Sequence, residues 1–145
     1  METHISIDTA SGIVSVGTLS IGPDLKPSDL PEGFSIGQEL PVITPGSLVA
    51  CQFAAAHLVE NGQLLRLELR FEHGVLVSCF FTFPGVPPGD EHRACGAWLT
   101  EHIGAASGLV RFAWGCAGVA SDRSGDSHVF LHNKNNHWAH GAVIR

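Results

Sequence analysis

The clearest pattern in the chain is an alternation of apolar and charged residues between positions 65 and 72. The apolar members are Leu65, Leu67, Leu69 and Phe71, and the charged members are Arg66, Glu68, Arg70 and Glu72. Successive side chains of a β-strand point to opposite faces of the sheet. The segment is therefore predicted to be a strand with one buried face and one solvated face.

Turn signals on both sides make this strand the middle of a meander. Asn61-Gly62 precedes it, the pair most typical of a type I′ hairpin turn, and Gly74 follows it. The run 75–83 is apolar on both faces, which predicts a central strand. An antiparallel meander over 50–83 is expected.

The first strand of the meander is ambiguous. Ser47 could cap a helix that begins at Leu48, and the alanines at 54–56 favour a helix. The Asn-Gly turn favours a strand instead, because it joins two strands of matched length. We predict a strand over residues 48–59.

A helix is predicted at about 90–104, after the Pro/Gly-rich stop at 84–89. Asp90 is placed as its N-cap and Gly104 as its C-terminal stop. Its apolar stripe consists of Ala94, Ala97, Trp98, Leu99 and Ile103. This helix is expected to pack on a face of the sheet.

Shorter strands complete the predicted sheet. Residues 5–7 and 13–16 suggest two strands at its edge, and residues 110–117 alternate like one continuous strand. A turn at 121–126 then leads into residues 127–132, so a hairpin over 109–132 is expected. The predicted fold class is α+β, an antiparallel sheet with one main helix.

The whole chain, 1–145, is predicted to be a single globular domain, because its length lies in the usual range for one domain. Residues 20–47 contain five prolines, which deny backbone donors to a central strand, and are interpreted as a Pro/Gly-rich loop. Residues 133–145 are interpreted as a polar C-terminal tail.

Charge and composition narrow the function. The net charge is −6 and the basic residues are scattered, which opposes nucleic-acid binding, because a phosphate backbone needs clustered cations. An acidic surface suits a basic protein partner. Only 15% of residues are charged, so the surface is compatible with a homodimer.

The four cysteines, at 51, 79, 95 and 116, form no Cys-x-x-Cys motif, and a chain of this length has a core without disulfides. The first residues lack the pattern of a signal peptide, and no apolar run approaches the ~20 residues needed to span a bilayer. Buried reduced thiols, a cytoplasmic location and no membrane association are predicted.

Histidines provide the main candidates for chemistry. His132, His137 and His140 could share a metal ion, but structural zinc sites use four ligands, and a solvated tail is favoured. Trp138 lies between two of them and is predicted to be exposed. The group Trp138, His137 and His140 is therefore a candidate contact surface for a partner.

His92, Cys95 and His102 fall on the predicted helix and could form a Cys/His nucleophile pair. No third orienting group accompanies them, so packing of Cys95 beside the core is favoured. Asp122 and Asp126 lie in a tight turn without the ligand series of a calcium loop. They are predicted to form a hairpin turn and to contribute acidic contacts to a partner.

No nucleotide-binding or serine-hydrolase motif is present in the sequence, and no cofactor is expected. The favoured hypothesis is a non-enzymatic protein-binding or regulatory module, of the kind of a bacterial immunity or inhibitor protein that neutralises a basic partner. The alternative is a metal-dependent or Cys/His enzyme that uses His92, Cys95, His102 or the tail histidines.

Overall fold

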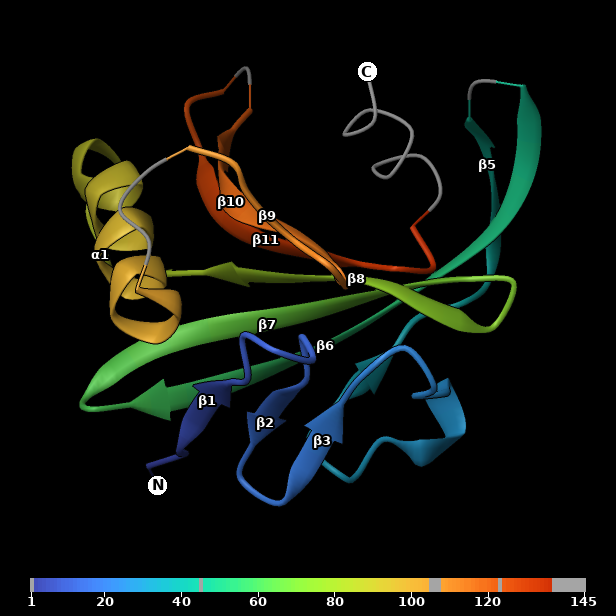
Figure 1. Cartoon of the computed structure of the whole chain (residues 1–145), viewed down its shortest axis with the longest axis horizontal. Helices are drawn as coiled ribbons and strands as arrows, with labels where there is room; N and C mark the ends of the chain where they lie inside the picture. Colours follow the sequence, from blue (N-terminus) through green and yellow to red (C-terminus); the bar gives the residue numbers. More distant parts are fainter. Residues whose placement is uncertain (1, 45, 105–107, 123, 137–145) are drawn as a thin grey trace.

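The computed structural model describes residues 2–44, 46–104, 108–122 and 124–136. These residues form two antiparallel sheets and one α-helix (Figure 1). The smaller sheet consists of β1 (Ile5–Ile7), β2 (Val14–Val16) and β3 (Leu19–Ile21). The larger, eight-stranded sheet consists of β4 (Ser35–Ile36), β5 (Leu40–Thr44), β6 (Ser47–Glu60), β7 (Gln63–Glu72), β8 (Val75–Thr82), β9 (Val110–Phe112), β10 (Gly115–Ser121) and β11 (Ser127–Asn133).

The predicted meander forms the centre of the large sheet. Strands β6, β7 and β8 are consecutive antiparallel neighbours, and β11 and β10 continue the sheet beyond β8. Asn61 and Gly62 both have positive φ, 50° and 78°, as a type I′ turn requires. The prediction of a strand over 48–59 is confirmed, because the turn chemistry outweighs the helix propensity of the alanines.

The small sheet covers one face of the large sheet and closes the hydrophobic core. Ile5, Val14 and Ile21 from the small sheet belong to the same buried cluster as Leu67 and Phe81 from the large one. The expectation that the N-terminal strands form an edge of the main sheet is therefore wrong. Three-residue strands with alternating burial stack on the apolar face instead of extending it.

The Pro/Gly-rich segment 20–47 contributes short strands to the main sheet. Both β4 and β5 pair with the same edge of β6, and β5 contains Pro41. A single 3₁₀ turn, Pro27–Asp29, lies between β3 and β4. The other end of the sheet is the three-residue strand β9.

The continuous strand expected over 110–117 is wrong. The chain turns at Ala113–Trp114, so β9 and β10 are antiparallel partners, with Phe112 opposite Gly115. A Cβ at Gly115 would collide with the carbonyl oxygen of His132, and its φ of 152° favours glycine. The alternation of bulky and small residues does not reveal this reversal, because the turn residues Ala113 and Trp114 continue the same alternation. The hairpin of β10 with β11 is present.

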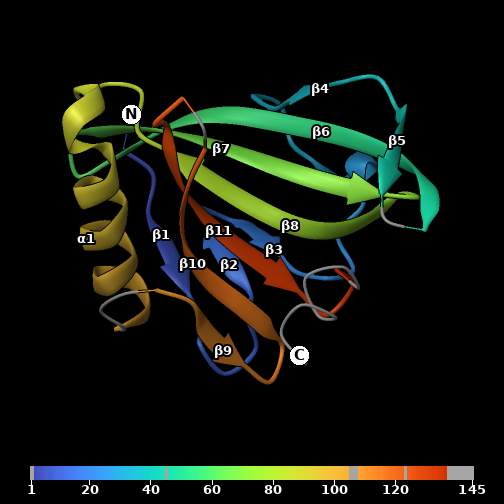
Figure 2. The ribbon, with the colours of Figure 1, turned by 90° about the horizontal axis from the view of Figure 1, so that it is seen from above.

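The helix α1 (Glu91–Ile103) ends where the sequence predicts, with Gly104 at φ 76° and its N–H bonded to the carbonyl of Thr100. Figure 2 shows the helix alongside β1 and beside the β10–β11 hairpin. Trp98 is buried and packs on Phe81, with ring centroids 4.5 Å apart, whereas Ala97 of the predicted stripe is exposed. The α+β fold class is confirmed.

No helix in the described part of the chain is long and apolar enough to cross a membrane.

Candidate protein-binding face

The face of the large sheet opposite the core carries half-exposed polar and aromatic side chains, and we call it the open face. It is formed by the charged positions of β7 and by the residues paired with them on β6, β8 and β11. The pairing registers align these residues in three rows across the sheet. Listed from β6 to β11, the rows are His57–Arg66–Thr82, Ala55–Glu68–Phe80–Phe130, and Phe53–Arg70–Ser78–His132. His128 continues the first row on β11, next to Val129, the partner of Phe81.

Two ion pairs run along β7 on this face. Arg66 Nη1 lies 3.1 Å from Glu68 Oε2, and Arg70 Nε lies 3.0 Å from Glu72 Oε2. The second contact lacks the geometry of a hydrogen bond, so charge attraction alone holds it. The Arg70 guanidinium also lies 5.8 Å from the ring centroid of Phe53. The four charges are therefore balanced locally while their side chains remain partly accessible.

Aromatic rings occupy the middle of the open face. Phe80 meets His128 edge-on at 5.5 Å, and Phe130 stacks on His132 at 4.7 Å. A shallow depression of about 300 Å³ lies over this area, lined by Phe53, Arg66, Glu68, Arg70, Phe80, Thr82 and His128. Aromatic and arginine side chains of this kind are enriched in protein interfaces.

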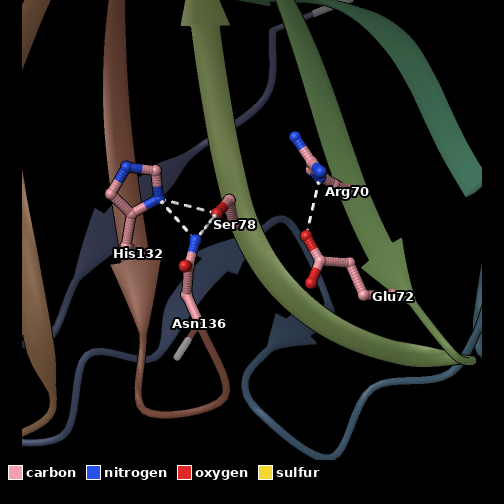
Figure 3. A network of polar contacts seen from close by, with 5 residues as sticks. All are labelled: Arg70, Glu72, Ser78, His132 and Asn136. Atoms are coloured by element: carbon pink, nitrogen blue, oxygen red, sulfur yellow. Dashed lines mark hydrogen bonds and ion pairs between the residues drawn. The ribbon is translucent and has the colours of Figure 1, made fainter. Parts of the chain in front are cut away.

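A buried polar network anchors one end of the open face (Figure 3). The Asn136 amide donates to Ser78 Oγ at 2.8 Å, and the Ser78 hydroxyl lies 2.6 Å from His132 Nδ1. Asn136 also lies 3.2 Å from the same nitrogen, so Nδ1 acts as an acceptor and the imidazole is neutral. Burial lowers the pKa of His132 to about 4, with smaller contributions from His128 and Arg70.

The structure places His132 in this network. Within the described ranges, no group of three His, Cys, Asp or Glu side chains could hold a metal ion. His137, Trp138 and His140 lie outside the described residues.

The predicted helix residues do not meet to form a nucleophile pair. Cys95 is fully buried, and desolvation raises the pKa of its thiol to about 11, with Glu91 adding to the shift. His92 contacts Ser121 at 3.4 Å. A thiol with a raised pKa and no access is a poor nucleophile. All four cysteines are buried and unpaired, as predicted.

His102 instead belongs to a cluster that the sequence does not indicate. Its Nδ1 donates to the Trp98 carbonyl at 2.8 Å, and its Nε2 lies 2.9 Å from Glu60 Oε2. Trp98 Nε1 donates to the other Glu60 oxygen at 2.8 Å. Glu60 thus connects the β6–β7 turn to the last turns of α1. The residues are 38 and 42 positions apart, and no local pattern links them.

Asp122 and Asp126 form the predicted turn between β10 and β11. Asp122 Oδ1 accepts hydrogen bonds from the Ser124 and Asp126 amides at 2.9 and 3.0 Å. Hydrogen bonds, first that from the Ser124 hydroxyl, lower the pKa of Asp122. The turn therefore carries a stable negative charge beside the His128 end of the open face.

Sequence reasoning located the charged half of the open face but not its aromatic half. Phe80 lies in the mostly apolar run 75–83, and Phe130 lies between Val129 and Leu131, so the hydrophobicity of the neighbours gives no reason to expect partial exposure of either ring. Their register with Glu68 would have indicated it, because paired residues share a face.

Comparison with known proteins locates one solved structure with the same fold. No family model and no curated protein matches the sequence. The chain is similar to a chain in the structure described as "Rhs1-CT in complex with cognate immunity protein RhsI1". The match has a TM-score of 0.62 at 14% identity and covers 97% of both chains. At this identity the likeness concerns the fold.

Proposed function

We propose that this protein is a non-catalytic binding module of the immunity type, which uses the open face to bind and neutralise a toxin domain. The observation that carries the proposal is the contrast between the two faces of the large sheet. One face is sealed by the small sheet, whereas no described element covers the other. Similarity of fold to a structure of a toxin with its immunity protein supports the same function.

The chemistry of the open face suits a protein surface better than a small substrate. The depression is shallow, and its charges are already paired within the chain. The half-exposed aromatic rings provide apolar contact area, and the paired charges surround them with polar groups. Protein interfaces usually combine an apolar centre with a polar rim in this way. A catalytic site would instead need an accessible reactive group, and Cys95 is buried.

The partner is proposed to be basic. The chain carries a net charge of −6, and Asp122 and Asp126 extend the open face with two carboxylates. His137, Trp138 and His140 are proposed as additional contacts, since they follow directly after the Asn136 network in the chain. A bacterial cytoplasm, where an immunity protein must meet an incoming toxin, is the proposed location.

Co-expression tests the proposal. Each open reading frame adjacent to this gene in the source genome is expressed with and without the chain, and growth and co-purification are measured. We expect one neighbour to arrest growth alone, to be tolerated with the chain, and to co-purify with it. The complex should weaken as salt rises, because the attraction between opposite net charges is screened.

Two matched variants assign the surface. Thr82→Arg places a long cation on the open face, while Ser20→Arg places the same side chain on the exposed side of the small sheet. Thr82→Arg should weaken binding at least tenfold, about 1.4 kcal/mol, and Ser20→Arg should not. Equal effects, or a neighbour that is toxic regardless of the chain, would contradict the proposal.

A further inference from the structure

The outer edge of β1 lies beside a groove that is separate from the open face. β1 is the end strand of the small sheet and pairs only with β2. On its other side is a groove of about 550 Å³, lined by residues 2–7, by Glu60 and Asn61 of the β6–β7 turn, and by Glu101 and His102 of α1. The volume lies within the range of pockets that hold ligands.

The hydrogen-bond register shows which backbone groups point into the groove. Gly17 N donates to the His4 carbonyl, and Asp8 N donates to the Ile13 carbonyl. In an antiparallel ladder these bonded pairs alternate with non-bonded pairs. The pairs Ile5–Val16 and Ile7–Val14 are therefore non-bonded, and the N–H and C=O groups of Ile5 and Ile7 point away from β2.

These backbone groups have no partner within the described part of the chain. Both residues line the groove, and Ile5 is only 3% exposed and Ile7 9%. Backbone donors and acceptors in such positions are normally paired. Two residues before Ile5, the same edge already makes a strand-like bond, from Thr3 N to the Val59 carbonyl at 2.6 Å.

The charge of the groove selects the kind of strand that it could accept. Three carboxylates line it, from Glu2, Glu60 and Glu101, and no lysine or arginine does so among the described lining residues. The Glu60 oxygens are engaged by Trp98 and His102, whereas the Glu101 side chain is exposed. An incoming segment with basic side chains would complement this field.

We propose that the free edge of β1 binds an extended segment of a protein partner, bearing lysine or arginine, as an added strand. Main-chain bonds to Ile5 and Ile7 provide the pairing, and the groove carboxylates provide the preference for basic side chains. The groove follows six residues, roughly 20 Å of strand. The inference does not depend on the open face or on a toxin, so failure of the co-expression test leaves it standing.

The test uses two capped five-residue peptides and the whole ¹⁵N-labelled chain. The first alternates Lys and Val (Lys at both ends), and the second has Glu in place of Lys. On titration to millimolar concentration, the Lys peptide should shift the Ile5 and Ile7 amides and slow their hydrogen exchange at least tenfold. The Glu peptide should bind at least tenfold more weakly.

Backbone pairing is tested on the peptide, so the protein fold is untouched. Two versions of the Lys peptide are N-methylated, one at every Val and one at every Lys. In an added strand only the N–H groups of alternate residues point toward β1, so one of the two versions removes all of them. At least one version should lose binding. Full binding by both, or shifts confined to the open face, would overturn the proposal.

Paired charge variants complete the experiment. The double substitution Glu2→Gln and Glu101→Gln removes two groove carboxylates and should weaken the Lys peptide about threefold or more. The fold is retained, because the side-chain amide introduced at position 2 keeps an oxygen that can accept the hydrogen bond from Gly62 N. Glu32→Gln with Glu39→Gln removes the same charge outside the groove and should have no effect. Unchanged affinity in the first double variant would remove the electrostatic part of the inference.

Discussion

The two faces of β7 differ in exposure and in their contribution to stability, although their residues alternate along one strand. Leu65, Leu67 and Leu69 are 0% exposed and lie in the core, while the arginines and glutamates between them remain partly accessible. The core face provides most of the stability, because each leucine removes apolar area from water. The exposed Arg66–Glu68 pair on the open face contributes far less to stability.

The largest expected effect is on the core face. Leu67→Ala should lower the free energy of unfolding by about 2–5 kcal/mol, because it leaves a cavity between the two sheets. Urea denaturation followed by tryptophan fluorescence measures this loss. A change below about 1 kcal/mol would mean that the small sheet does not seal the core as described.

Acid should destabilise the protein through His132, on the open face. Its pKa in the folded protein is about 4, below the ordinary value of 6.5. Between these two pH values the imidazole is protonated in the unfolded chain and neutral in the folded one. The stabilisation is complete above pH 6.5 and is lost as the pH falls toward 4, by up to about 3 kcal/mol.

Unfolding of wild type, His132→Gln and His57→Gln at pH 7 and pH 4.5 isolates this contribution. His57 is an exposed histidine on the same face, so its variant should follow the wild type. The His132 variant should lose less stability on acidification. Parallel behaviour of all three proteins would argue against a neutral His132 in the network.

A smaller loss is expected when the buried hydroxyl of the open face is removed. Ser78→Ala leaves His132 Nδ1 without its closest partner, and the free energy of unfolding should fall by about 1–2 kcal/mol. Ser20→Ala, at an exposed serine of the small sheet, serves as the control in the same denaturation assay. If both variants unfold alike, the network contributes no net stability.

The smallest effect belongs to the exposed ion pair. The side chains of Arg66 and Glu68 are 39% and 31% exposed, so solvent screens their attraction. Arg66→Ala should change the free energy of unfolding by no more than about 0.5 kcal/mol. The contrast with Leu67→Ala, one residue away, would measure how far the two faces of β7 differ in their contribution to stability.

Local chemistry explains which elements could be predicted from the sequence. Three predicted features follow from local rules and are present in the structure. They are the period of two in β7, the Asn61-Gly62 turn, and Gly104 at the end of the helix. The separate N-terminal sheet could not be derived, because its three-residue strands give no sign of which surface they cover. The break at Ala113–Trp114 was missed because the reversal preserves the alternation.

The site was less predictable than the fold for a related reason. Clusters such as Ser78–His132–Asn136 and Glu60–Trp98–His102 join segments tens of residues apart, and they depend on strand register. The sequence indicated His132 and His102 as chemically interesting side chains. It gave no indication that their roles would be to hold strands and helix together.

The two ends of the large sheet have a consequence for behaviour in concentrated solution. β9 offers only three residues for pairing, and β5 includes Pro41, which lacks a backbone N–H. Both features oppose the edge-to-edge addition of further copies that leads to fibres. The chain can thus keep long, highly apolar strands at its centre without polymerising through its margins.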